Sequence, residues 1–160
     1  MAADPPSPDV LKRTTVMVRD AEAAARWYEA AFGMTRAMDT PFTLSGRQLA
    51  AGAAGDRTRL VIMAGEDAGL GAIGLLQWVD PPMDAPAEPA SRIAFGQPIF
   101  VVAAADCRAT VERARAAGGR VHCEPYEWTV TGFDGREQRM LGASLFDPDG
   151  YFFEVNERLA

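Results

Sequence analysis

The chain has 160 residues, of which 48% are hydrophobic, and its 16 basic and 22 acidic side chains give a formal net charge of −6. This length suffices for one domain with a buried core, and the acidic balance argues against nucleic acid as a partner. The longest strongly apolar run, residues 99–105, is far too short to cross a bilayer, so we expect no membrane partner. Two cysteines and the lack of an apolar leader indicate a reducing, cytoplasmic location.

Residues 1–10 are rich in proline and aspartate and lack periodicity, so we expect a flexible N-terminal arm followed by one domain over residues 11–160. Residues 13–18 alternate with a period of two and carry β-branched side chains, which predicts a strand. Asp20 then caps a helix that Gly33 ends. Apolar residues recur along this helix at helical spacing: Ala24, Trp27, Tyr28, Ala31 and Phe32.

Three more strands are predicted after this helix, at residues 34–42, 59–64 and 72–79, separated by stretches that contain glycine and aspartate. The first unit, residues 11–80, therefore has the order strand, helix, strand, strand, strand. A proline-rich linker follows over residues 81–96.

The same order returns in residues 97–157. A strand at 99–103 precedes a capping aspartate, Asp106, and the interval from Asp106 to Gly119 equals that from Asp20 to Gly33. Three strands are again expected, at 121–126, 139–146 and 151–156. The sequence thus predicts an α+β fold made of two βαβββ modules.

The last two strands meet at an Asp-Pro-Asp-Gly turn over residues 147–150, which is typical of a tight hairpin. Side chains alternate along the outgoing strand, so Tyr151, Phe153 and Val155 share one face. The opposite face carries Phe152, Glu154 and Asn156. We expect the first face to lie in the core and the second to form the wall of a cavity.

With these pieces in place, the chain resembles the vicinal oxygen chelate superfamily over residues 11–157. This superfamily includes glyoxalase I, extradiol dioxygenases and bleomycin-resistance proteins. The resemblance rests on residues 16–20 leading into Trp27 and Tyr28, residues 32–34, residues 115–119, and residues 146–150 with Glu154. It implies a curved, cup-shaped mixed sheet with helices on its convex side, a metal in the cup of some members, and a homodimer.

The resemblance also implies metal-ligand positions on the first and last strands of each module. Glu154 matches the last-strand glutamate of the second module. The first-strand positions are occupied by Arg13 and Ile99, neither of which binds a divalent cation. In the first module the last-strand position falls near Leu75, with Gln77 two residues further on the same face.

His122 is the only histidine of the chain, so an iron site with two histidines cannot form within one subunit. An extradiol dioxygenase is therefore not expected, and neither is a cofactor. A divalent metal held by Glu154, His122 and Glu124 is the alternative that the sequence leaves open.

Glu154 and Arg13 are the candidate catalytic residues. Glu154 can act as a general base or accept a hydrogen bond from a ligand. Arg13 can pair with Glu154 or bind a carboxylate or phosphate of the ligand. The candidate ligand-binding residues are Thr15, Met17, Gln77, Val101, Tyr126, Trp128, Phe152 and Asn156.

Tyr126 and Trp128, together with Phe133, belong to a segment for which the resemblance implies a loop that closes over the ligand. Aromatic rings there can stack on a planar or cationic molecule. A hydrophobic cluster or a dimer contact is the other interpretation of these rings.

The sequence therefore predicts a metal-independent pocket for a small organic molecule. The protein either binds and sequesters this molecule or acts on it as a lyase or isomerase through proton transfer by Glu154, and both versions remain open. The alternative function is a divalent-metal-dependent lyase of glyoxalase type that uses Glu154 and His122.

Overall fold

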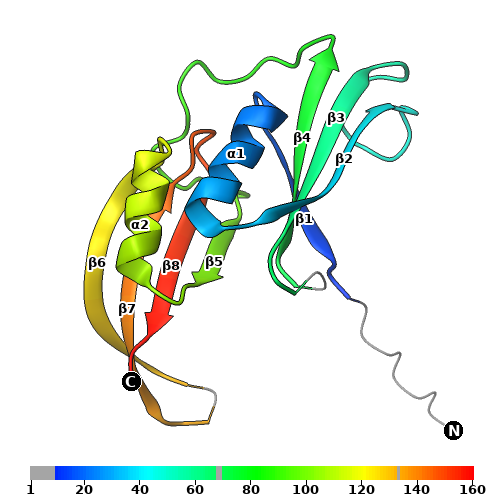
Figure 1. The fold of residues 1–160 in the computed structure, drawn as a ribbon. Coiled ribbons are helices and arrows are strands. Elements are labelled where there is room, and N and C mark those ends of the chain that lie inside the picture. The colour runs from blue at the N-terminus through cyan, green and yellow to red at the C-terminus, as the bar shows by residue number, and fades with distance from the viewer. Residues whose placement is uncertain (1–9, 68–69, 133) are drawn as a thin grey trace, which may run out of the picture.

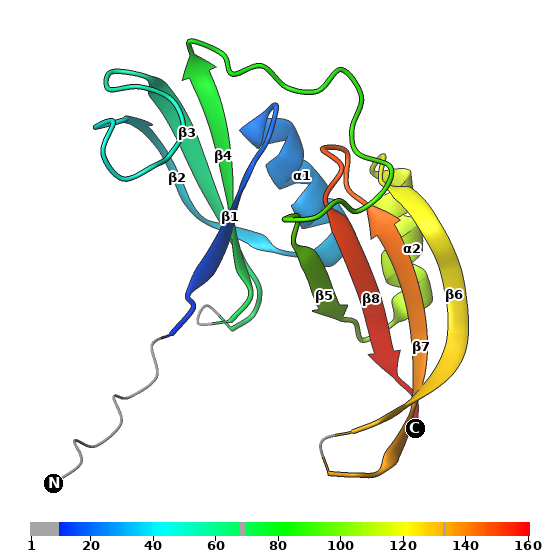
Figure 2. The same ribbon diagram turned by 180° about the vertical axis from the view of Figure 1, so that it is seen from behind.

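The computed structural model describes residues 10–67, 70–132 and 134–160, and the chain forms two successive βαβββ units (Figures 1 and 2). The elements of the first unit are β1 (Arg13–Met17), α1 (Ala21–Phe32), β2 (Thr35–Thr43), β3 (Arg57–Ala64) and β4 (Ala72–Asp80). The elements of the second are β5 (Ile99–Ala103), α2 (Cys107–Ala116), β6 (Arg120–Thr131), β7 (Glu137–Phe146) and β8 (Phe152–Arg158). The predicted fold class is confirmed.

Each unit builds its own four-stranded mixed sheet. The strand orders are β1-β4-β3-β2 and β5-β8-β7-β6, and the first strand of each unit pairs in parallel with the last. All other strand pairs are antiparallel. Within the described ranges no strand of one sheet pairs with a strand of the other, so the expected cup consists of two separate half-sheets.

The helices begin where the sequence predicted. The Asp20 carboxylate accepts hydrogen bonds from the backbone N–H groups of Glu22 and Ala23 at 2.8 and 2.9 Å. The Asp106 carboxylate accepts from the N–H of Ala109 at 2.9 Å. Gly33 ends α1 in the left-handed region, with φ of 67°, which glycine adopts without steric cost.

One hydrophobic core joins the two units. Phe153 of β8 is fully buried, and its ring centroid lies 5.8, 5.9 and 5.1 Å from those of Trp27, Tyr28 and Phe32 in α1. Figure 2 shows α1 in the gap between the two sheets and α2 behind β7 and β8. Since the helices and this core occupy one side of each sheet, the other side carries no helix.

A second connection between the units lies at the turn before β8. Asp147 is 4% exposed, and its carboxylate accepts hydrogen bonds from the Tyr28 hydroxyl at 3.1 Å and from the N–H groups of Asp149 and Tyr151 at 3.0 and 2.8 Å. Burial raises the pKa of Asp147 to about 6, because removal from water disfavours the charged form more than these donors favour it. The predicted turn therefore contains a buried carboxyl group that also anchors α1.

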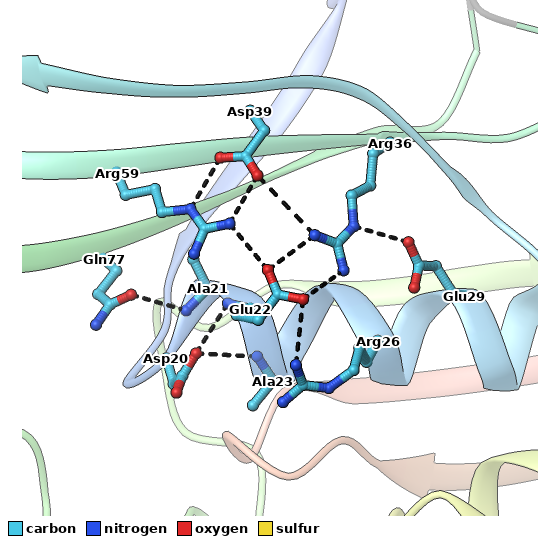
Figure 3. A network of polar contacts seen from close by, with 10 residues as sticks. All are labelled: Asp20, Ala21, Glu22, Ala23, Arg26, Glu29, Arg36, Asp39, Arg59 and Gln77. Atoms are coloured by element: carbon cyan, nitrogen blue, oxygen red, sulfur yellow. Dashed lines mark hydrogen bonds and ion pairs between the residues drawn. The ribbon is translucent and has the colours of Figure 1, made fainter.

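An ion-pair network fixes α1 against β2 and β3 (Figure 3). Glu22 accepts from Arg36 at 2.8 and 2.9 Å and from Arg59 at 2.9 Å, and Arg59 also donates to Asp39 at 2.6 Å. Hydrogen bonds from the two guanidinium groups lower the pKa of Glu22 to about 2. Because the Glu22 side chain is 35% exposed, water and salt weaken these attractions.

The first sheet has a smaller apolar cluster on its helix-free side. It consists of Leu60, Leu76 and Trp78 of the sheet and Leu44 of the segment that connects β2 and β3, all of which are buried. The Trp78 indole N–H donates to the Asp56 carboxylate at 3.2 Å, which holds this segment in place.

The β6–β7 hairpin is longer than predicted. Paired strands extend to Thr131 and resume at Glu137, so most of the segment expected to be a loop is regular sheet. Phe133 lies outside the described residues. Among those that are described, no helix combines the length and apolar character needed to span a bilayer.

Candidate functional site

A cavity of about 470 Å³ lies on the helix-free face of the second sheet. It is lined by residues of three adjacent strands: His122, Cys123, Tyr126 and Trp128 of β6, Gly142, Ala143 and Ser144 of β7, and Phe152, Glu154 and Asn156 of β8. The predicted alternation along β8 is confirmed, because Phe153 and Val155 are fully buried in the core on the opposite face.

Glu154 is central in this sheet. It pairs in register with Val101 of β5 on one side and with Ser144 of β7 on the other. Its side chain is exposed, and within the described ranges no protein group donates a hydrogen bond to it or forms an ion pair with it. Its carboxylate is therefore available to a ligand.

Aromatic rings form one end of the cavity. The His122 ring lies 6.1 Å from the rings of both Phe146 and Phe152 in edge-on contacts. Phe146 and Phe152 are themselves 5.0 Å apart. This end offers a planar ligand an apolar contact surface beside the carboxylate.

A glycine makes room for the opposite end. A Cβ atom at Gly142 would lie 2.6 Å from Trp128 Nε1 and 3.0 Å from Asn156 Oδ1. The side chains of Trp128 and Asn156 therefore lie directly over Gly142, and a larger residue at position 142 would collide with them. Gly142 and Ser144 were not among the predicted site residues, although a glycine inside a strand pattern is a known sign of such a close approach.

Irregular pairing in β6 adds a thiol to the cavity. Strict alternation would separate His122 from Cys123, but the register shifts between Val121 and Cys123 and again between Cys123 and Tyr126. These bulges bring both side chains to the same cavity.

Arg13 does not join Glu154. It lies exposed on β1 of the first sheet, where its Nε donates to Thr15 Oγ1 at 3.1 Å. None of the ion pairs of the described residues links Arg13 to Glu154, and the cavity includes no residue of the first module. The predicted pair is thus not formed within one chain, because the two half-sheets are separate.

Gln77 was predicted on the wrong face. Its Oε1 accepts the backbone N–H of Ala21 at 3.0 Å, on the side of β4 that α1 covers (Figure 3). The strand register explains the error. Val101 pairs with Glu154 in the second module, and Thr15, which holds the equivalent place in the first module, pairs with Gly74. The counterpart of Glu154 in the first module is therefore Gly74, one residue before the expected position.

Glu124 does not belong to the cavity either. Both its carboxylate oxygens accept from Arg115 of α2, at 2.8 and 2.9 Å, on the helix side of the sheet. Across residues 10–67, 70–132 and 134–160, no three His, Cys, Asp or Glu side chains gather closely enough to hold a metal ion. The alternative ligand set of Glu154, His122 and Glu124 is therefore not assembled.

The other predicted residues divide between the two sheets. Tyr126, Trp128, Phe152 and Asn156 line the cavity with Glu154, and their role in binding stays a prediction. Val101 is 67% exposed next to Glu154 but outside the cavity lining. Thr15 and Met17 are exposed on β1, and Met17 lines a different hollow beside the linker between the two modules.

Two βαβββ modules, each with a mixed sheet and one helix, define the class of this fold. The family model for the Glyoxalase/Bleomycin resistance protein/Dioxygenase superfamily matches residues 10–155, and the chain belongs to this superfamily. A search of curated protein sequences gives no match.

Solved structures show the same fold at low sequence identity. A glyoxalase family protein from Bacillus cereus is 16% identical, with a TM-score of 0.77 over 99% of this chain and 100% of that one. Glyoxalase I from Zea mays is 19% identical, with a TM-score of 0.60 over 94% of this chain and 45% of its own. TioX from a Micromonospora species is 16% identical, with a TM-score of 0.54 over 92% and 97% of the two chains.

Proposed function

We propose that this protein binds a small organic molecule in the cavity of the second sheet, without a metal, and that Glu154 is the anchoring residue. The observation that carries the proposal is an exposed carboxylate inside an aromatic-lined cavity, to which none of the described residues donates a hydrogen bond. Such a cavity favours a planar ligand with a cationic or hydrogen-bond-donating group, because rings stack on its walls while Glu154 accepts the donor.

A matched pair of probes tests this proposal by calorimetry. 4-Aminoquinoline is cationic near neutral pH, whereas quinoline has the same ring system without the charge. We expect 4-aminoquinoline to bind about tenfold more tightly, as one charge-assisted hydrogen bond of about 1.5 kcal/mol implies.

Two variants that each remove one negative charge then test whether Glu154 causes the preference for 4-aminoquinoline over quinoline. Glu154→Gln should remove the preference for 4-aminoquinoline. Glu137→Gln alters an exposed carboxylate of the same sheet outside the cavity and should leave the preference intact. Equal affinities of the two probes, or equal losses in the two variants, would reject the proposal.

The same variant separates a binding protein from an enzyme once a natural ligand is in hand. Loss of affinity in Glu154→Gln, with no turnover in the native protein, identifies sequestration. Loss of turnover at unchanged affinity identifies proton transfer by Glu154 in a lyase or isomerase.

A metal-dependent lyase is the second candidate, because His122 lines the same cavity as Glu154 and both are donor types that divalent metals accept. Among the described residues, however, no three His, Cys, Asp or Glu side chains gather closely enough to hold an ion. Stoichiometric zinc, nickel or manganese in the purified protein, lost in His122→Gln, would favour this candidate over the lead proposal.

We also propose that the protein is a homodimer. β1 and β5 are edge strands, and they present exposed apolar side chains: Met17 at 50%, Ile99 at 52% and Val101 at 67%. Such edges favour association with another chain. Light scattering of the native protein should give twice the chain mass, and Val101→Lys should give the monomer.

A further inference from the structure

The end of the cavity above Gly142 holds a hydrogen-bond donor beside an acceptor. A Cβ atom at Gly142 would lie 2.6 Å from Trp128 Nε1 and 3.0 Å from Asn156 Oδ1, so the two atoms lie close to one point. Trp128 belongs to β6 and Asn156 to β8, the strands on either side of β7. Both residues line the cavity that contains Glu154.

Neither of these two groups is satisfied inside the described part of the protein. Of the three tryptophans, only Trp78 has an indole N–H that finds an acceptor there, namely Asp56. The one buried side-chain nitrogen or oxygen without a partner among these residues belongs to Trp27. Trp128 and Asn156 are partly exposed, so their unpaired atoms are open to solvent, and a ligand can replace water at both.

A planar cyclic amide, or lactam, is the simplest complement to such a pair. The indole N–H only donates and the amide oxygen only accepts. A lactam carries a carbonyl oxygen and an N–H group side by side on one rigid edge, so it can bond to Trp128 and Asn156 together. An ether or a carboxylate lacks the donor and would leave Asn156 unpaired, which costs affinity.

The rest of the cavity sets the size of the ligand. Phe152, Glu154 and Asn156 share the cavity face of β8, and two residues along a strand span about 7 Å. A fused two-ring molecule has about this length. A lactam held at Asn156 therefore carries its second ring past Glu154 towards the aromatic end at Phe152, and the cavity of about 470 Å³ has room for it.

We propose that the ligand of this cavity is a flat, fused-ring lactam, whose carbonyl oxygen accepts the Trp128 indole hydrogen and whose ring N–H donates to Asn156. This proposal rests on the function proposed for Glu154 and names the chemical class of its ligand. Trp128 and Asn156 then determine specificity, while Glu154 accepts a donor group elsewhere on the rings.

Three probes separate the two hydrogen bonds in calorimetry on the full chain. 2-Quinolone offers the carbonyl and the N–H of a lactam, N-methyl-2-quinolone keeps only the carbonyl, and quinoline has neither. We expect the affinity to fall about fivefold at each step, as the loss of one neutral hydrogen bond implies.

Two substitutions then assign each bond to its residue. Trp128→Phe keeps a ring and loses the donor, so it should weaken both quinolones about fivefold. Asn156→Leu keeps the size and loses the acceptor, so it should weaken 2-quinolone alone. Trp78→Phe removes an indole N–H in the first sheet that already donates to Asp56, and it should change neither affinity. Circular dichroism checks that each variant is folded.

The outcomes distinguish this proposal from the one on which it rests. Equal affinities of 2-quinolone and N-methyl-2-quinolone would overturn the lactam proposal, as would equal losses of both quinolones in Asn156→Leu. The function proposed for Glu154 still stands in those cases if 4-aminoquinoline binds more tightly than quinoline. Failure of all four probes to bind would reject both proposals.

Discussion

The buried carboxyl group of Asp147 makes the stability of this fold depend on pH. Its pKa is about 6 in the folded chain, above its ordinary value of 3.8. The folded state therefore holds the proton more tightly than the unfolded state. The stabilising contribution is complete below about pH 4 and is lost as the pH rises through about 6.

These two pKa values give the expected size of the effect. Between about pH 5 and about pH 7.5, the free energy of unfolding should fall by about 1.4 kcal/mol through Asp147 alone. Asp147→Asn cannot titrate, so this share of the decrease should disappear in the variant. The Asn oxygen can still accept from the backbone N–H groups that the Asp147 carboxylate binds.

Urea unfolding, followed by circular dichroism at both pH values, measures the free energy of unfolding of the native chain and of Asp147→Asn. His122→Gln, which replaces the only histidine of the chain, serves as a control variant. If the native chain and Asp147→Asn lose equal free energy between the two pH values, the account of this buried carboxyl group is wrong.

Three further predictions concern the core, the cavity and the surface network. Phe153→Ala should lower the free energy of unfolding by about 3–5 kcal/mol in urea titrations, because its ring joins β8 to α1; a loss below about 1 kcal/mol would contradict a shared core. Gly142→Ala should displace the Trp128 indole and weaken 4-aminoquinoline binding, whereas Gly65→Ala, with open space at its Cβ, should not. Glu22→Gln should lower the melting temperature slightly at low salt and not at about 1 M salt; an equal loss at both would exclude an electrostatic cause.

Local sequence signals predicted the elements well because their causes are local. The capping aspartates Asp20 and Asp106 and the stop at Gly33 depend on hydrogen bonds and φ angles within a few residues. The alternation around Glu154 was equally readable, since a strand with one buried face must alternate.

Register and bulges limited the prediction of the site. The face of Gln77 was wrong because a one-residue displacement along β4 exchanges the two faces of the strand. The bulges around Cys123 and the long β6–β7 hairpin depend on pairing between segments that are distant in sequence. The separation of Arg13 from Glu154 follows from how the two half-sheets pack around α1, which no local pattern records.

Chemical-shift mapping of bound 4-aminoquinoline tests the central claim, that the cavity around Glu154 is the functional site, most directly. The largest changes should fall on the backbone amides of residues 142–144 and 152–156 and on the Trp128 indole, all of which belong to this cavity or its strands. They should vanish in Glu154→Gln and persist in Glu137→Gln. Changes concentrated instead in the segment 42–51 of the first module, or unaltered in Glu154→Gln, would contradict the account.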